Sequence, residues 1–158
     1  MKRRLSLCIR YWDWCNNNCK FCFEKSKTFN YMFGMPSCEA VDKNNEQVKA
    51  LVDKEKYDFY TFKILGGELF AIKDVKTMEK IADSVEYFYD VFDKANLVDY
   101  ITTHTVPETL VIASNLLYSD RTALHMCLDR LRSKGKNIKA TMMVSYDLYG
   151  RFNSPGKL

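Results

Sequence analysis

The sequence lacks any long apolar run, and its longest apolar segments have only the length of a β-strand. A membrane-spanning helix needs about 20 consecutive apolar residues, so none is expected. The basic residues Lys2, Arg3 and Arg4 are not followed by the apolar segment and small-residue cleavage site of a signal peptide. These absences predict a cytoplasmic protein that does not enter a membrane.

The sequence also lacks a dense basic stretch. Its net charge is +4, with 24 Lys and Arg residues spread among 20 Asp and Glu residues. A nucleic-acid-binding surface concentrates basic residues on one face and interleaves them with aromatic ones, so direct nucleic-acid binding is not expected. Internal repeats and disorder-type composition are missing too. With 47% hydrophobic residues, the 158 positions predict one globular domain, residues 1–158.

What the sequence does contain is an alternation of strand and helix patterns. Apolar and polar residues alternate from Leu5 to Tyr11, as in a half-buried strand. Further strands are predicted at 59–65, 109–113 and 138–144, and helices at 44–56, 73–94 and 120–135. Four strands that alternate with three helices predict an α/β fold of about four βα units with a parallel sheet.

Specific residues support each predicted helix. Asn44 and Asn45 are expected to cap the first helix, Asp120 the last, and Gly135 is expected to end it. The middle helix has an apolar stripe that is expected to face the core, formed by Val75, Met78, Ala82, Val85, Tyr89 and Phe92.

Polar and glycine-rich segments follow the four predicted strands. Ligands of parallel sheets and barrels bind at the carboxyl ends of the strands, which meet along one edge. That rule selects the cysteine-rich loop, Gly66-Gly67-Glu68, Ser114-Asn115 and the segment that begins at Ser145. The sequence therefore predicts one functional edge of the sheet.

Three cysteines follow the first strand within eight residues, in the pattern C-x3-C-x2-C: Cys15, Cys19 and Cys22. Closely spaced thiolates can bind one compact iron–sulfur cluster, and three ligands on a four-iron cluster leave one iron open for a reacting ligand. Cys8, Cys38 and Cys127 are scattered and are interpreted as ordinary thiols. A zinc site is the alternative, but His104, His125 and Cys38 do not have the spacing of a zinc knuckle.

This pattern resembles the signature of the radical S-adenosylmethionine (SAM) superfamily, and Phe21 occupies its aromatic position. The resemblance implies a partial (βα) barrel and a [4Fe–4S] cluster bound by Cys15, Cys19 and Cys22. In that family the cluster reductively cleaves SAM to methionine and a 5′-deoxyadenosyl radical, which abstracts hydrogen from a substrate. Reduced flavodoxin or ferredoxin is the electron donor that the resemblance implies.

The resemblance also implies which residues bind SAM. Gly66, Gly67 and Glu68 are similar to the family's GGE motif, in which the backbone and the carboxylate hold the SAM ammonium. Ser114 and Asn115 occupy a place where the family contacts SAM, although an asparagine turn that ends a strand explains them equally well. The remaining candidates are Phe21, Ser145 and Arg151, and Arg151 could instead be a surface residue.

A complete radical SAM core has six βα units, so the domain is expected to be incomplete at its C-terminus. The substrate stays open among a small molecule, a peptide and a protein. Two alternatives also stay open. The chain could be a glycyl-radical-enzyme activase that acts on a protein partner, or an iron–sulfur or zinc binding module without catalytic activity.

Overall fold

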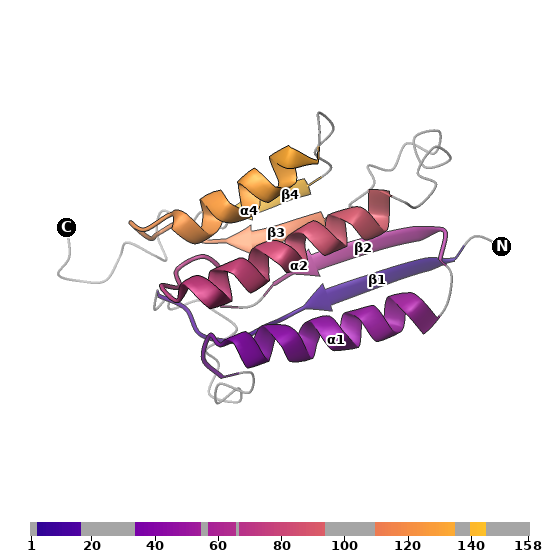
Figure 1. The fold of residues 1–158 in the computed structure, drawn as a ribbon, viewed down its shortest axis with the longest axis horizontal. Helices are drawn as coiled ribbons and strands as arrows, with labels where there is room; N and C mark the ends of the chain where they lie inside the picture. Colours follow the sequence, from indigo (N-terminus) through magenta and orange to yellow (C-terminus); the bar gives the residue numbers. More distant parts are fainter. Residues whose placement is uncertain are drawn as a thin grey trace.

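The computed structural model describes residues 3–16, 34–54, 57–65, 67–93, 110–134 and 140–144. In these residues strands and helices alternate along the chain (Figure 1). The strands are β1 (Arg4–Ile9), β2 (Phe59–Ile64), β3 (Leu110–Ser114) and β4 (Ala140–Val144), and the helices are α1 (Cys38–Lys54), α2 (Val75–Asp93) and α4 (Thr122–Ser133). The α/β class predicted from the sequence is confirmed.

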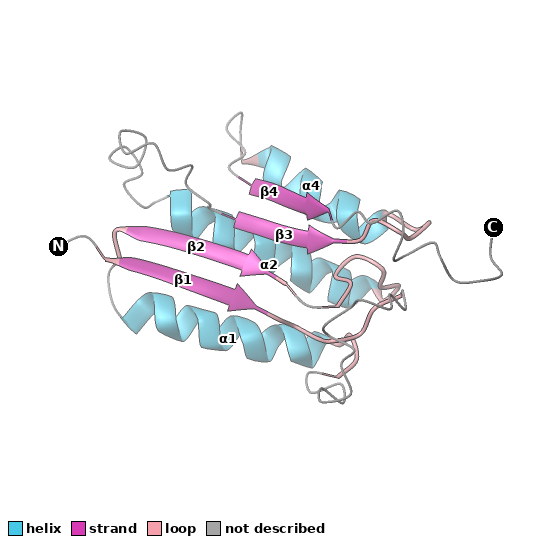
Figure 2. Cartoon of the chain, turned by 180° about the vertical axis from the view of Figure 1, so that it is seen from behind, coloured by secondary structure: helices cyan, strands magenta, loops and turns pink. Residues whose placement is uncertain are grey.

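The four strands form one parallel sheet in the order β1-β2-β3-β4. Ile9 pairs with Ile64, and Ile64 pairs with Ile112, so the first three strands end close to one another. Their carboxyl ends point to the same edge of the sheet (Figure 2). We term this edge the rim and define it by the described segments that follow β1 and β2, residues 10–16 and 67–70, and by the end of β3 with the residues after it, 114–118.

The three described helices cover one face of the sheet (Figures 1 and 2). Burial alternates along β1, where Ile9 is buried and Cys8 is exposed, because successive side chains of a strand point to opposite faces. Phe62 of β2 and Phe88 of α2 are fully buried, and their ring centroids lie 5.0 Å apart. The apolar core therefore lies between the sheet and its helices.

The predicted apolar stripe of α2 is mostly confirmed. Met78, Ala82, Val85 and Tyr89 are buried, together with the neighbouring Ile81 and Phe88. Val75 is 57% exposed, so its assignment to the core is wrong. It is the first residue of α2, where the helix has only begun to pack. The Phe92 side chain lies outside the described residues.

Helix α1 begins at Cys38, well before the predicted start at residue 44. Ser37 explains this start because its Oγ accepts a hydrogen bond from the Ala40 N–H (3.1 Å), as an N-cap residue does. Asn44 and Asn45 are interior residues of the helix rather than caps. Asn45 instead accepts a hydrogen bond from the Tyr11 hydroxyl at 3.1 Å.

Helix α4 begins at Thr122, two residues after the predicted cap. Asp120 still contributes, since its Oδ1 accepts a hydrogen bond from the Thr122 N–H at 2.9 Å, while Arg121 occupies the N-cap position. The predicted end at Gly135 lies outside the described residues. None of the helices described is both long enough and apolar enough to span a membrane.

Candidate functional site

The rim brings together residues from three strands that are far apart in the sequence. Cys15 follows β1, Gly67 and Glu68 follow β2, and Ser114 and Asn115 end or follow β3. A network of hydrogen bonds joins these segments. The structure therefore confirms the expectation that they meet at one edge, while the roles predicted for them remain predictions.

Glu68 lies at the centre of the network and is fully buried. Its Oε1 accepts hydrogen bonds from the Ser114 hydroxyl (2.9 Å) and the Phe70 N–H (3.2 Å). Its Oε2 accepts one from the Asn115 N–H at 2.6 Å. A buried carboxylate needs such donors to offset the loss of hydration. Glu68 thus connects the turn after β2 to the end of β3.

The backbone of Glu68 is bound to the segment after β1. Its N–H donates to the Trp14 carbonyl (2.8 Å), and its carbonyl accepts a hydrogen bond from the Trp12 indole N–H (3.1 Å). We term this pair of hydrogen bonds the tryptophan clasp. It fixes the approach to Cys15 against the turn after β2.

Gly67 allows this close approach. A Cβ atom at residue 67 would overlap the carbonyl oxygen of Trp14 and lie 2.8 Å from its carbonyl carbon. Any side chain would therefore push the two segments apart. The sequence suggested a glycine turn that lets the backbone approach a ligand, whereas in the structure the backbone approaches another part of the same chain.

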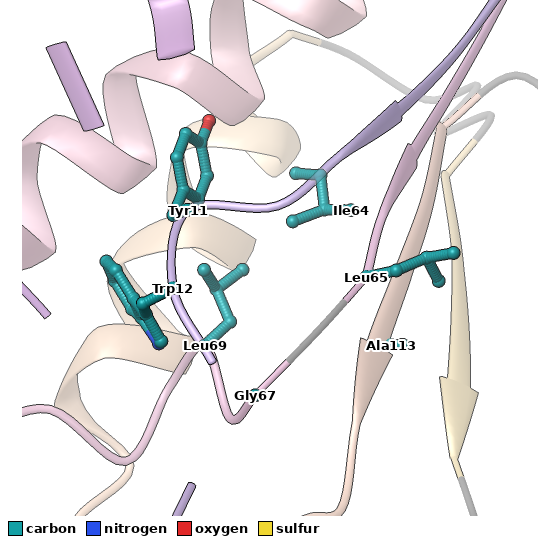
Figure 3. Close-up of a pocket in the computed structure, with 7 residues that line it drawn as sticks. All are labelled: Tyr11, Trp12, Ile64, Leu65, Gly67, Leu69 and Ala113. Carbon is teal, nitrogen blue, oxygen red and sulfur yellow. The ribbon is translucent and has the colours of Figure 1, made fainter. Parts of the chain in front are cut away.

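A small cavity lies beside Gly67, lined by Tyr11, Trp12, Leu69 and Ala113 among others (Figure 3). Its volume is about 10 Å³, which is roughly the space of one water molecule. A wider hollow of about 300 Å³ lies next to Trp14, between the segments that lead into α1 and α2. Met35 and Ile72 give it apolar walls, and Asp74 and Thr77 add polar groups.

Ser114 and Asn115 form a polar turn that ends β3. The Asn115 Oδ1 accepts a hydrogen bond from the Leu117 N–H (2.7 Å), and the Ser114 Oγ accepts one from the Leu116 N–H (3.1 Å). Leu116 has a φ of 53°, in the left-handed region that non-glycine residues rarely adopt. The asparagine turn considered from the sequence is present.

The Asn115 side chain also reaches the cysteine loop. Its Nδ2 donates to the Cys15 Sγ at 3.5 Å and to the Asn16 Oδ1 at 2.9 Å. Asn16 donates in turn to the Leu117 carbonyl at 2.7 Å. The first cysteine of the triplet is therefore linked through Asn115 to the buried Glu68.

Several residues of this network were not singled out as candidate site residues from the sequence, among them Trp12, Trp14, Asn16 and Tyr118. Tyr118 lies 3.2 Å from the Ser114 Oγ through its hydroxyl, and burial raises its pKa. The aromatic run from Tyr11 to Trp14, directly before the triplet, was the signal that could have indicated the clasp. No comparable feature of the sequence indicated Tyr118.

Several predicted site residues lie outside the described residues: Cys19, Phe21, Cys22, Gly66, Ser145 and Arg151. The same holds for His104, one of the alternative zinc ligands. In the described ranges, no three His, Cys, Asp or Glu side chains form a group that could bind a metal ion. Of the triplet, only Cys15 belongs to those ranges.

The other cysteines have separate surroundings. Cys127 is buried in α4, and burial raises the pKa of its thiol to about 12. Cys8 is exposed on β1, and the Cys38 Sγ lies 3.4 Å from the Thr77 hydroxyl at the start of α1. His125 is exposed on α4.

The donor chemistry at the rim fits an iron–sulfur cluster. The sequence supplies three thiols within eight residues, and the described one, Cys15, is half-buried and accepts an N–H from Asn115. Thiolates with N–H donors directed at the sulfur are the usual surroundings of such clusters. Comparisons with protein-family models, curated proteins and solved structures found no match to this chain.

Proposed function

We propose that this chain is a radical SAM enzyme whose [4Fe–4S] cluster is bound by Cys15, Cys19 and Cys22. One observation carries the proposal: the hydrogen-bond network that joins Cys15, Glu68 and Ser114-Asn115 at the carboxyl edge of a parallel sheet. These are the segments that the resemblance assigns to the cluster and to SAM. Their contact supports a common site.

The fold that goes with this function is a partial (βα) barrel. The parallel order β1-β2-β3-β4, with the three described helices on one face, supports it. The face of the sheet opposite the described helices would then line the barrel interior.

The proposed SAM contacts are Phe21, Gly66, Gly67, Glu68, Ser114, Asn115, Ser145 and Arg151. Glu68 needs a specific account, because its carboxylate is fully buried and already accepts hydrogen bonds from Ser114 and Asn115. Because the Glu68 side chain is fully buried, a SAM ammonium could reach it only if one of the groups packed around it moved aside. The peptide groups beside Gly67 and the hydroxyl of Ser114 would complete the ligand's polar contacts.

When bound, the cluster supplies the electron that splits the SAM sulfonium into methionine and a 5′-deoxyadenosyl radical. Reduced flavodoxin or ferredoxin would provide that electron, in a cytoplasmic setting that keeps the thiols reduced. The chain's own residues position the first ligand and hold the three loop segments together. The hydrogen donor is a small molecule, a peptide or a protein.

The proposal is tested by anaerobic reconstitution with iron and sulfide, followed by reduction in the presence of SAM. Release of 5′-deoxyadenosine is expected from the unchanged chain. Cys19→Ala should abolish cluster assembly, because two thiols cannot replace three. Cys127→Ala is the matched control, since Cys127 is buried in α4 on the helix side of the sheet, and it should assemble the cluster normally.

Other results would point elsewhere. A [4Fe–4S] protein that releases no 5′-deoxyadenosine would favour a non-catalytic iron–sulfur module. Stoichiometric zinc after anaerobic purification, with no cluster uptake, would overturn the radical SAM proposal. A glycyl-radical-enzyme activase would release 5′-deoxyadenosine and form a glycyl radical on a protein partner, which electron paramagnetic resonance detects.

A further inference from the structure

Asn115 contacts the first cysteine of the triplet through its side chain and the buried carboxylate through its backbone. Its Nδ2 lies 3.5 Å from the Cys15 Sγ and 2.9 Å from the Asn16 Oδ1. The two hydrogens of the amide group therefore have two different acceptors, one of which is the thiol. The sequence suggested a SAM contact or a simple turn for this residue, and neither requires a bond to the thiol.

The orientation of the amide is determined by its neighbours. The Oδ1 of Asn115 accepts a hydrogen bond from the Leu117 N–H at 2.7 Å. A rotated amide would place its NH₂ group against that N–H, with two donors facing each other and no acceptor. The neighbouring amide of Asn16 is oriented in the same way, because its Nδ2 donates to the Leu117 carbonyl at 2.7 Å. The Asn115 donor must therefore face the sulfur.

The backbone of Asn115 is fixed as well. Its N–H donates to the Glu68 Oε2 at 2.6 Å, and Glu68 is fully buried and also bound to Ser114. A hydrogen bond to a carboxylate is about twice as strong as one between neutral groups. The N–H donor beside Cys15 is thus held in place before any ligand binds.

We infer that Asn115 is a positioning residue for Cys15 and that its amide tunes the reduction potential of the cluster. An N–H directed at a ligating sulfur stabilises negative charge there, and reduction adds negative charge to the cluster. Asn115 therefore favours the reduced cluster. The inference rests on the proposed cluster at Cys15, while the contact between the amide and the thiol can be tested without metal.

The first experiment measures the Asn115 side-chain NH₂ signals by NMR in the metal-free, reduced full-length chain. Loss of the signals in Asn115→Asp assigns them. Cys15→Ala should then shift one of the two proton signals, since each proton has a different acceptor. Cys8→Ala, a substitution of an exposed cysteine, should shift neither. An unchanged spectrum in Cys15→Ala would overturn the contact.

The second experiment measures the midpoint potential of the reconstituted cluster. Asn115→Leu removes the donor, so the potential should become more negative than in the unchanged chain. Asn115→Asp has nearly the same shape and keeps an acceptor for Leu117, but it places a carboxylate oxygen near the sulfur, so its potential should be the most negative. Asn44→Leu, on α1, is the control and should leave the potential unchanged.

The outcomes separate this inference from the proposed function. Equal potentials in the three chains would overturn the tuning role even if the cluster is active. The tuning role predicts that the midpoint potential becomes more negative from the unchanged chain to Asn115→Leu and then to Asn115→Asp. A purely structural role would not give this order. If the unchanged chain binds no cluster, the proposed function and the tuning role both fail, and a shifted amide signal would then show that the contact alone is correct.

Discussion

Between β2 and α2 the chain is held by apolar packing, with the rings of Phe62 and Phe88 5.0 Å apart and both side chains fully buried. At the rim, a few residues beyond the end of β2, a buried carboxylate and two peptide groups hold the chain instead. Apolar packing tolerates small shifts, whereas hydrogen bonds require particular atoms in particular places. The core therefore stabilises the domain, and the rim determines where each loop lies.

The largest effect is expected from Phe88→Ala, which removes a buried ring from the core. The free energy of unfolding should fall by about 3–5 kcal/mol, because the contacts and the buried apolar area of the ring are lost. Urea denaturation followed by circular dichroism measures it. Val75→Ala on the same helix is the control, and its effect should stay within about 0.5 kcal/mol because Val75 is 57% exposed.

Gly67→Ala should be the most damaging small change at the rim. The added Cβ would overlap the Trp14 carbonyl oxygen, which belongs to the backbone and cannot rotate away. A loss of about 2–3 kcal/mol is expected from overpacking, together with a change in the tryptophan environment. Gly34→Ala has open space around it and a φ of 72°, so it should lose only about 1–2 kcal/mol and leave the tryptophans unaffected. If Gly67→Ala and Gly34→Ala changed the tryptophan environment equally, the overlap with the Trp14 carbonyl would be contradicted.

Glu68→Gln replaces a buried acceptor by a group that carries a donor. One side-chain oxygen becomes an NH₂ group facing either the Ser114 hydroxyl or the Asn115 N–H. Leaving a buried polar group unpaired should lower the free energy of unfolding by about 1–3 kcal/mol. Urea denaturation measures the loss, and amide hydrogen exchange should show faster exchange at residue 115. Glu79→Gln, exposed on α2, should change neither.

The smallest effect is expected at the partly exposed ion pair between Glu86 of α2 and Lys134 after α4, 2.8 Å apart. Lys134 lowers the pKa of Glu86 below its ordinary value. The stability that ionised Glu86 contributes is therefore present at pH values above its unfolded-state pKa. It is lost as the pH falls through the folded-state pKa of Glu86. Glu86→Gln should remove a small stabilisation at pH 7 and almost none at pH 2, as measured by thermal unfolding. A loss that grows at low pH would contradict this sign.

The elements could be predicted from the sequence because they depend on local periodicity. The repeat of apolar residues gave α2 to within two residues at its start, and strand 59–65 differs from β2 by one residue. Helix α1 was missed at its start because Ser37 stands before a polar segment with weak periodicity. Val75 was misplaced because the pattern alone does not show where packing begins.

The rim could be predicted only in part. The topology of a parallel sheet places the ends of β1, β2 and β3 together, so the meeting of Cys15, Glu68 and Asn115 followed from the order of the elements. The hydrogen-bond partners of these residues could not be predicted from the order of the elements. The bond from Asn115 to Cys15 joins residues 100 positions apart, and no spacing rule indicates which atom of an amide faces which neighbour.

The tryptophan clasp has a practical consequence for spectroscopy. The sequence contains two tryptophans, and both of them, Trp12 and Trp14, belong to the clasp beside Cys15. Intrinsic fluorescence excited at the indole band therefore originates at the rim, without background from tryptophans elsewhere in the chain. An iron–sulfur cluster at Cys15 would quench both indoles by energy transfer. Emission intensity can thus follow cluster assembly in real time, with no added label.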